Sequence, residues 1–231
     1  MRVVGLIGGM SWESSHQYYR LLNETVRNRT TPLTNAKSLM YTVNFAEIEA
    51  LQHAGRWDEA GAMMIDAAQR LERGGAECVV LCTNTMHKLA DAITVSVQIP
   101  LLHIADATAK AVKAAGIERI GLLGTAFTME QDFYKGRLTN NFGLEVITPE
   151  KRQRERVHRI IYDELCAGVI RDSSRAEYVA IMENLVARGA QGMILGCTEI
   201  MLLVSPADCH VPTFDTTALH ALAAADFALS V

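Results

Sequence analysis

The same short stretch occurs twice in this sequence. Residues 75–86 (GAECVVLCTNTM) align without a gap to residues 189–200 (GAQGMILGCTEI), at a separation of 114 positions. Two shorter matches keep the same order along the chain: residues 5–8 with 121–124, and residues 99–102 with 211–214. Their separations are 116 and 112 positions. Three matches in one order predict a duplicated α/β unit.

Short apolar runs alternate with helical patterns in both halves of the chain. Continuous apolar runs such as Val3–Ile7 are typical of buried parallel strands, and Trp57–Arg73 carries an apolar helix face. Alternating strands and helices give parallel sheets flanked by helices. We therefore predict an α/β fold with two pseudo-twofold-related lobes and an active site in the cleft between them. The predicted bounds are residues 1–104 plus 216–231 for the N-terminal lobe and 105–215 for the C-terminal lobe.

Composition narrows the functional classes. The net charge is −4, which argues against nucleic-acid binding, because nucleic-acid-binding proteins usually carry a basic face. No apolar stretch approaches the length of a membrane span, and the N-terminus does not resemble a signal peptide, so we expect a cytoplasmic protein that does not bind a membrane. The five cysteines form no CxxC pair, which predicts free thiols and neither disulfides nor a metal site.

Small polar residues follow four of the predicted strands, in the segments 8–11, 83–85, 124–128 and 197–199. Ligands of open parallel sheets bind at the carboxyl ends of strands, so these segments are the candidate site. The duplication places Thr83 opposite Cys197, a hydroxyl where the second copy has a thiol. His87 and His103 are weaker acid–base candidates.

Cys197 is the strongest candidate for catalysis. We expect it to begin a helix, whose N-terminus would lower the thiol pKa and favour a thiolate base or nucleophile. The alternative is a small buried packing residue. Glu199 would either tune the thiol, raising its pKa if close, or cap the helix. Cys82 precedes Thr83 by one position, and we expect it to point to the other face of the sheet and to be structural.

At these residues the chain resembles the aspartate/glutamate racemase family, cofactor-independent amino-acid racemases. The resemblance covers essentially the whole chain and is carried by the segments 5–10 (GLIGGM), 84–85 (NT), 124–125 (GT) and 196–199 (GCTE). Glutamate racemases usually carry His where this chain has Glu199, and an Asp-Ser-Gly pattern where it has Gly-Gly-Met-Ser. Both differences favour the aspartate/glutamate branch.

The resemblance implies an isomerase of D-amino-acid metabolism in which two cysteines flank the substrate Cα. One thiolate removes the α-proton and the opposite thiol returns a proton, without pyridoxal phosphate or another cofactor. The implied partner is an acidic amino acid, and a homodimer is common in the family. The implied substrate contacts are Gly9, Met10, Gln52, Asn84, Thr85, Thr125, Thr198 and Glu199; among these, Gln52 is the nearest polar candidate for the acidic side chain.

Thr83 departs from the family pattern, because it stands where the family has its first cysteine. A threonine hydroxyl is too weakly acidic to serve as a base at neutral pH, although it can position a water or relay a proton. By the resemblance, Cys197 is the base for the L-isomer, with Thr83 opposite, which predicts a preference for L-aspartate or L-glutamate. Two alternatives remain: a single-cysteine decarboxylase or isomerase of the same superfamily, and a non-catalytic protein that binds acidic amino acids.

Overall fold

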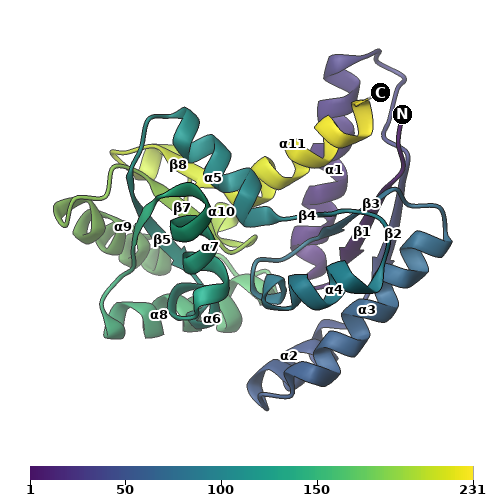
Figure 1. Cartoon of the computed structure of the whole chain (residues 1–231). Coiled ribbons are helices and arrows are strands. Elements are labelled where there is room, and N and C mark those ends of the chain that lie inside the picture. The colour runs from purple at the N-terminus through teal and green to yellow at the C-terminus, as the bar shows by residue number, and fades with distance from the viewer. Residues whose placement is uncertain (231) are drawn as a thin grey trace. The chain divides into compact units, whose positions relative to one another are not determined.

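The structure is a computed structural model that describes residues 1–230. The chain divides into two compact units (Figure 1). The first consists of Met1–His103 and the C-terminal segment from His220 onward, and the second is Ile104–Leu219. Within residues 1–230, no helix is long and apolar enough to cross a membrane.

The first unit is built on a four-stranded parallel sheet in the order β2-β1-β3-β4. Its strands are β1 (Val4–Gly8), β2 (Ser38–Thr42), β3 (Cys78–Leu81) and β4 (Leu101–Leu102). Its helices are α1 (Trp12–Arg29), α2 (Phe45–His53), α3 (Trp57–Arg73), the 3-10 helix η1 (Thr85–Leu89), α4 (Ala90–Ser96) and most of α11 (Thr216–Leu229).

The second unit repeats this plan, with a parallel sheet in the order β6-β5-β7-β8. Its strands are β5 (Arg119–Gly124), β6 (Glu145–Ile147), β7 (Met193–Gly196) and β8 (Thr213–Asp215). Its helices are α5 (Ile104–Ala114), α6 (Ala126–Glu130), α7 (Asp132–Phe142), α8 (Lys151–Asp163), α9 (Asp172–Ala187) and α10 (Ile200–Leu203), with the 3-10 helices η2 (Leu165–Ala167) and η3 (Pro206–Asp208).

Strand register confirms the duplication. In the first sheet, Gly5 pairs with Val79, and Val79 pairs with Leu101. The corresponding partners in the second sheet are Gly121, Met193 and Thr213. The equivalent residues are therefore 116, 114 and 112 positions apart, the separations of the three sequence matches. The predicted fold class, two units each built on a parallel sheet flanked by helices, is confirmed.

Each sheet has an apolar cluster on both faces, because successive strand residues point to opposite sides. In the first unit, Val79 and Leu81 pack with α3, while Val80 and Cys82 pack with α1 and α11. The face of α11 in that second cluster consists of Ala221, Ala224, Ala225 and Ala228. Small side chains let this helix run close beside α1 (Figure 1). Sheets covered on both faces explain why the strand sequences are continuously apolar.

Candidate active site

The ends of β1 and β3 lie side by side, because the two strands pair in parallel. Gly9 follows β1 with φ of 91°, and a Cβ there would lie 2.2 Å from the Val43 carbonyl oxygen, so only glycine fits. Its backbone N–H donates to the Ser15 hydroxyl at 2.8 Å. The predicted contact from this N–H to substrate therefore competes with a hydrogen bond inside the protein. Met10, the next residue, is buried.

The Thr83 loop, residues 83–87, follows β3 and is buried. The Thr83 N–H donates to the Leu81 carbonyl at 2.8 Å, and the His87 N–H donates to the Asn84 carbonyl at 3.1 Å. The His87 side chain is buried, and its Nδ1 donates to the Thr83 carbonyl at 2.7 Å. Both ends of the Thr83 backbone unit are thus fixed. Thr85 begins η1.

Gln52 comes to this loop from α2. The side chain is buried, and its Nε2 lies 3.0 Å from the Sδ of Met86. The structure therefore brings Gln52 next to the segment that carries Asn84 and Thr85, within the first unit.

In the second unit, the ends of β5 and β7 meet at the paired residues Gly124 and Gly196. A Cβ on Gly124 would lie 2.7 Å from the Gly196 carbonyl oxygen, so the two strand ends are in close contact. Thr125 follows Gly124 and caps α6, where its Oγ1 accepts a hydrogen bond from the Thr128 N–H at 3.3 Å. Two predicted site residues, Thr125 and Cys197, thus directly follow neighbouring strands.

Cys197 is buried directly after β7, and its thiol is hydrogen-bonded to a carboxylate. Its Sγ donates to Glu199 Oε2 at 2.9 Å, and the Thr198 hydroxyl donates to the same oxygen at 3.0 Å. Burial raises the pKa of the Cys197 thiol well above its usual value, and the charge of Glu199 raises it further.

The expected low thiol pKa at Cys197 is therefore wrong. The helix that would lower it begins only at Ile200 and spans a single turn, Ile200–Leu203, so Cys197 lies outside its N-terminus. Desolvation and a neighbouring negative charge both disfavour a thiolate, and they dominate. Glu199 is the N-cap residue of α10, but its side chain makes no capping hydrogen bond and contacts the Cys197 thiol instead.

Residues 7–224 match the family model described as Asp/Glu/hydantoin racemase. The chain belongs to the Asp/Glu/hydantoin racemase family. It is similar over the full length of both chains to the crystal structure of a candidate Asp/Glu racemase from Yersinia pestis, with 55% identity and a TM-score of 0.93. It is also similar over both full lengths to an aspartate racemase homologue from Pyrococcus horikoshii, with 33% identity and a TM-score of 0.85.

A curated relative extends the comparison to a protein with a named activity. The broad specificity amino-acid racemase RacX of Bacillus subtilis is 26% identical over 164 residues, which cover 70% of this chain and 69% of the relative. The resemblance drawn from the sequence motifs is thus confirmed at the level of the Asp/Glu/hydantoin racemase family.

Two of the other cysteines, Cys166 and Cys209, pack against the apolar cluster that contains Cys197, whereas Cys78 and Cys82 lie in the first unit. Cys82 lies in the apolar cluster beneath α11, and burial raises its pKa. Burial likewise raises the pKa of Cys78 to about 12. Cys166 and Cys209 are partly exposed. Among residues 1–230, no group of three or more His, Cys, Asp or Glu side chains could hold a metal ion.

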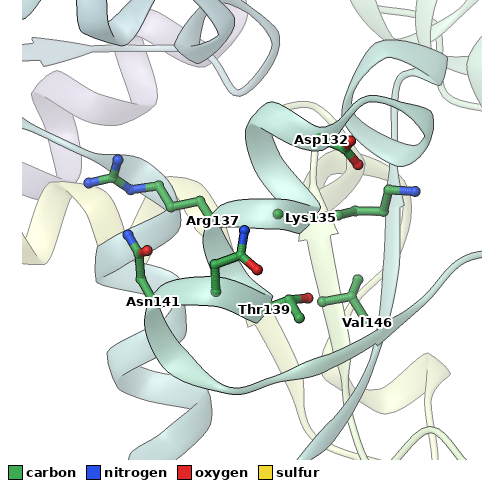
Figure 2. A pocket seen from close by; sticks show the side chains of 8 residues that line it. Asp132, Lys135, Arg137, Thr139, Asn141 and Val146 are labelled. Carbon is green, nitrogen blue, oxygen red and sulfur yellow. The ribbon is translucent and has the colours of Figure 1, made fainter.

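A cavity of about 640 Å³ lies elsewhere in the second unit and contains none of the predicted site residues. Side chains of α7 line it, with Val146 from β6 (Figure 2). One of its cations, Arg137, is bound to Asp106 through two hydrogen bonds of 2.6 and 2.8 Å. The cavity is therefore separate from the candidate site residues at the strand ends.

Sequence reasoning missed His220. This residue belongs to the predominantly apolar α11, yet its ring packs against His87 with a centroid separation of 5.7 Å. No local signal identifies such a contact, because the two residues are 133 positions apart. Predicting it would have required knowing that α11 packs beside the Thr83 loop.

Proposed function

We propose that this protein is an amino-acid racemase that acts on aspartate or glutamate without pyridoxal phosphate, with Cys197 as the base for the L-isomer. The observation that carries the proposal is the thiol of Cys197, held at a strand end by the carboxylate of Glu199 at 2.9 Å. Family membership supports the reaction class, because the matching family model describes racemases.

The Cys197–Glu199 pair supplies a path for the first proton. In the resting protein the raised pKa keeps Cys197 as a thiol, so its proton must leave before the sulfur can act as a base. Transfer to Glu199 Oε2 leaves a thiolate and a neutral carboxyl group. The thiolate then takes the proton from Cα of the L-isomer, and the electron pair of the C–H bond remains on the substrate as a carbanion. A thiol of raised pKa gives a thiolate of raised basicity, which suits a weakly acidic C–H bond.

The second proton is proposed to arrive on the opposite face of Cα, which the proposal assigns to Thr83. Its hydroxyl cannot remove a proton at neutral pH, but it can donate one that is replaced from water. The hydroxide left by that water takes up the proton that Glu199 received from Cys197, which restores the resting carboxylate. The groups on the two faces of Cα therefore differ in base strength, with Cys197 the stronger base. The α-proton of the L-isomer is the one that is removed readily. Proton transfer between Thr83 and Cα therefore limits the rate of inversion.

Substrate binding is proposed to use the polar residues at the strand ends. Hydroxyl, amide and backbone N–H groups suit the α-carboxylate and the α-amino group of an amino acid. The proposed set is Met10, Gln52, Asn84, Thr85, Thr125 and Thr198, with Gly9 contributing only if its N–H exchanges Ser15 for substrate. The names of the Pyrococcus homologue and of the Bacillus relative support an amino-acid substrate.

The direct test incubates the purified protein with L-aspartate and L-glutamate, without added pyridoxal phosphate, and follows the D-isomer by enantioselective chromatography. We expect D-isomer formation by the native protein and none by the Cys197→Ser variant. Substituted malonates are tested in parallel for release of CO2. Release of CO2 without racemisation would replace the proposal with a decarboxylase, and amino-acid binding without either reaction would replace it with a binding protein.

A further inference from the structure

Three histidines and a tyrosine pack ring to ring in the core of the first unit. The histidine cluster consists of Tyr18 on α1, His87 on η1, His103 between β4 and α5, and His220 on α11. Ring centroids are 4.5 Å apart for His87 and His103, 5.7 Å for His87 and His220, and 5.6 Å for Tyr18 and His220. All four residues are at most 8% exposed.

Hydrogen bonds to carbonyl groups fix where two of the rings carry hydrogen. A carbonyl oxygen only accepts, so the ring nitrogen that it contacts must be protonated. The Thr83 carbonyl contacts His87 Nδ1 at 2.7 Å, and the Leu102 carbonyl contacts His220 Nε2 at 2.7 Å. His87 therefore carries hydrogen on Nδ1 and His220 on Nε2.

The remaining nitrogen of His220 is held as well. Tyr18 Oη lies 2.9 Å from His220 Nδ1, so the His220 ring is bonded at both nitrogens. This fixed ring packs against His87 and restricts the orientation of the imidazole that contacts Thr83. Cluster and loop thus form one connected unit that ends at the Thr83 carbonyl.

The carbonyl of Thr83 accepts a hydrogen bond from a side chain, whereas the equivalent carbonyl of Cys197 accepts one from the backbone. The carbonyl of Cys197 accepts the N–H of Ile200 at 3.1 Å. After Thr83, the N–H of His87 donates to the Asn84 carbonyl, in a turn of the same size that lies one residue further along, and the imidazole of His87 supplies the donor to the Thr83 carbonyl. In the second copy, position 201 is a methionine, so the arrangement is particular to the threonine side.

We propose that His87 is a positioning residue for Thr83, one that fixes the backbone of Thr83 and through it the direction of the hydroxyl group. The inference rests on the proposed function, in which Thr83 serves the face of Cα opposite Cys197. A positioning role for His87 predicts that its loss affects inversion but not removal of the α-proton from the L-isomer. A general folding defect would lower both. Removal of the L-isomer α-proton depends on Cys197, whereas inversion also depends on Thr83 and hence on His87.

The experiment compares His87→Leu with His87→Asn, whose amide nitrogen can take the place of Nδ1. Each variant is incubated with L-aspartate in D2O; NMR follows loss of the α-proton, and enantioselective chromatography follows inversion. In His87→Leu we expect inversion to fall about 10- to 100-fold, the cost of a small misplacement of a reacting group. Exchange with retention should stay within about twofold of the native value, and His87→Asn should recover most of the inversion.

Other results overturn the inference. Unchanged inversion in His87→Leu, or a parallel fall in inversion and exchange, contradicts a positioning role at Thr83. A native protein that shows neither exchange nor inversion overturns the proposed function, and the role of His87 with it. If His87→Leu does not fold, nitrogen-15 NMR of the native protein decides: we expect hydrogen on Nδ1 of His87 and on Nε2 of His220, and a bare Nδ1 on His87 contradicts the inference.

Discussion

The loops after β3 and β7 start from equivalent strand ends and carry different side chains. Both follow the third strand of their unit, in the same register against the first strand. Three pairs of equivalent positions differ in their side chains: Thr83 with Cys197, Thr85 with Glu199, and His87 with Met201. One loop holds a thiol against a carboxylate, and the other holds a hydroxyl on a backbone anchored by an imidazole. The two copies thus share their strand register, while the side chains at equivalent positions of the loops differ.

Removing the reactive group from each loop should have unequal results, and this is the largest expected effect. Cys197→Ser should lower both exchange and inversion of L-aspartate about 10³-fold or more, because it removes the thiol that we propose takes the α-proton of the L-isomer. Thr83→Ala should abolish inversion while exchange of the L-isomer continues. Loss of both exchange and inversion in Thr83→Ala would contradict the proposal that Cys197 removes the α-proton of the L-isomer and Thr83 serves the opposite face.

Placing a cysteine in the Thr83 loop, as in the Cys197 loop, should create rapid α-proton exchange of the D-isomer. Thr83→Cys places a thiol at both equivalent positions, and a thiol is a far stronger acid than a hydroxyl. We expect exchange of the D-aspartate α-proton to rise about 10²-fold, which NMR in D2O measures. Thr83→Ser is the matched control, since it keeps a hydroxyl and should give no gain. Equal D-isomer exchange in the two variants would mean that position 83 does not face the substrate.

Glu199→Gln tests the feature that distinguishes the Cys197 loop. The carboxylate raises the pKa of the thiol through its charge and hydrogen bond, so its removal should lower that pKa. Alkylation of Cys197, followed by mass spectrometry over a range of pH, should then begin at lower pH than in the native protein. Turnover should nevertheless fall about 10²-fold, because the amide cannot accept the thiol proton. Glu199→Asp, which keeps the charge, is the control, and an unchanged alkylation profile in Glu199→Gln would contradict the contact.

The smallest effect concerns stability, and it follows from Cys82, whose equivalent in the other unit is Gly196. The folded-state pKa of Cys82 is raised by burial, whereas an unfolded thiol ionises near pH 8.5. The stability contribution is therefore complete below about pH 8.5 and is lost as pH rises, at about 1.4 kcal/mol per pH unit for each such thiol. Urea unfolding between pH 7 and 10 in reductant should show a shallower decline for Cys82→Ala. An unchanged slope would contradict burial of this thiol.

The fold was predictable because its evidence is local and repeated. Apolar runs such as Val3–Ile7 mark buried strands, and the three matched stretches fix their equivalence, which the strand register confirms. The position of Cys197 at a strand end followed from the same pattern. These features depend on neighbouring residues and on the separations between copies, both of which a single sequence displays.

Long-range contacts explain what the sequence did not predict. The direction of the Cys197 pKa shift was wrong because the helix begins at Ile200, and because the depth of burial depends on packing from distant segments. The hydrogen bond from Gly9 to Ser15 depends on how α1 leaves β1. The contact between His87 and His220 joins η1 to the C-terminal helix, and no periodicity in either segment indicates it.

Proton exchange at Cα is the most direct test of the difference between the two loops. Net inversion cannot reveal it, because the two enantiomers have equal free energy in water and the kcat/KM values for inversion must be equal in both directions. Each enantiomer of aspartate is therefore incubated in D2O with the native protein, and NMR follows loss of the α-proton. We expect L-aspartate to exchange much faster than it inverts, and D-aspartate to exchange only as fast as it inverts. Rapid exchange of D-aspartate without exchange of L-aspartate would contradict the assignment of Cys197 to the L-isomer.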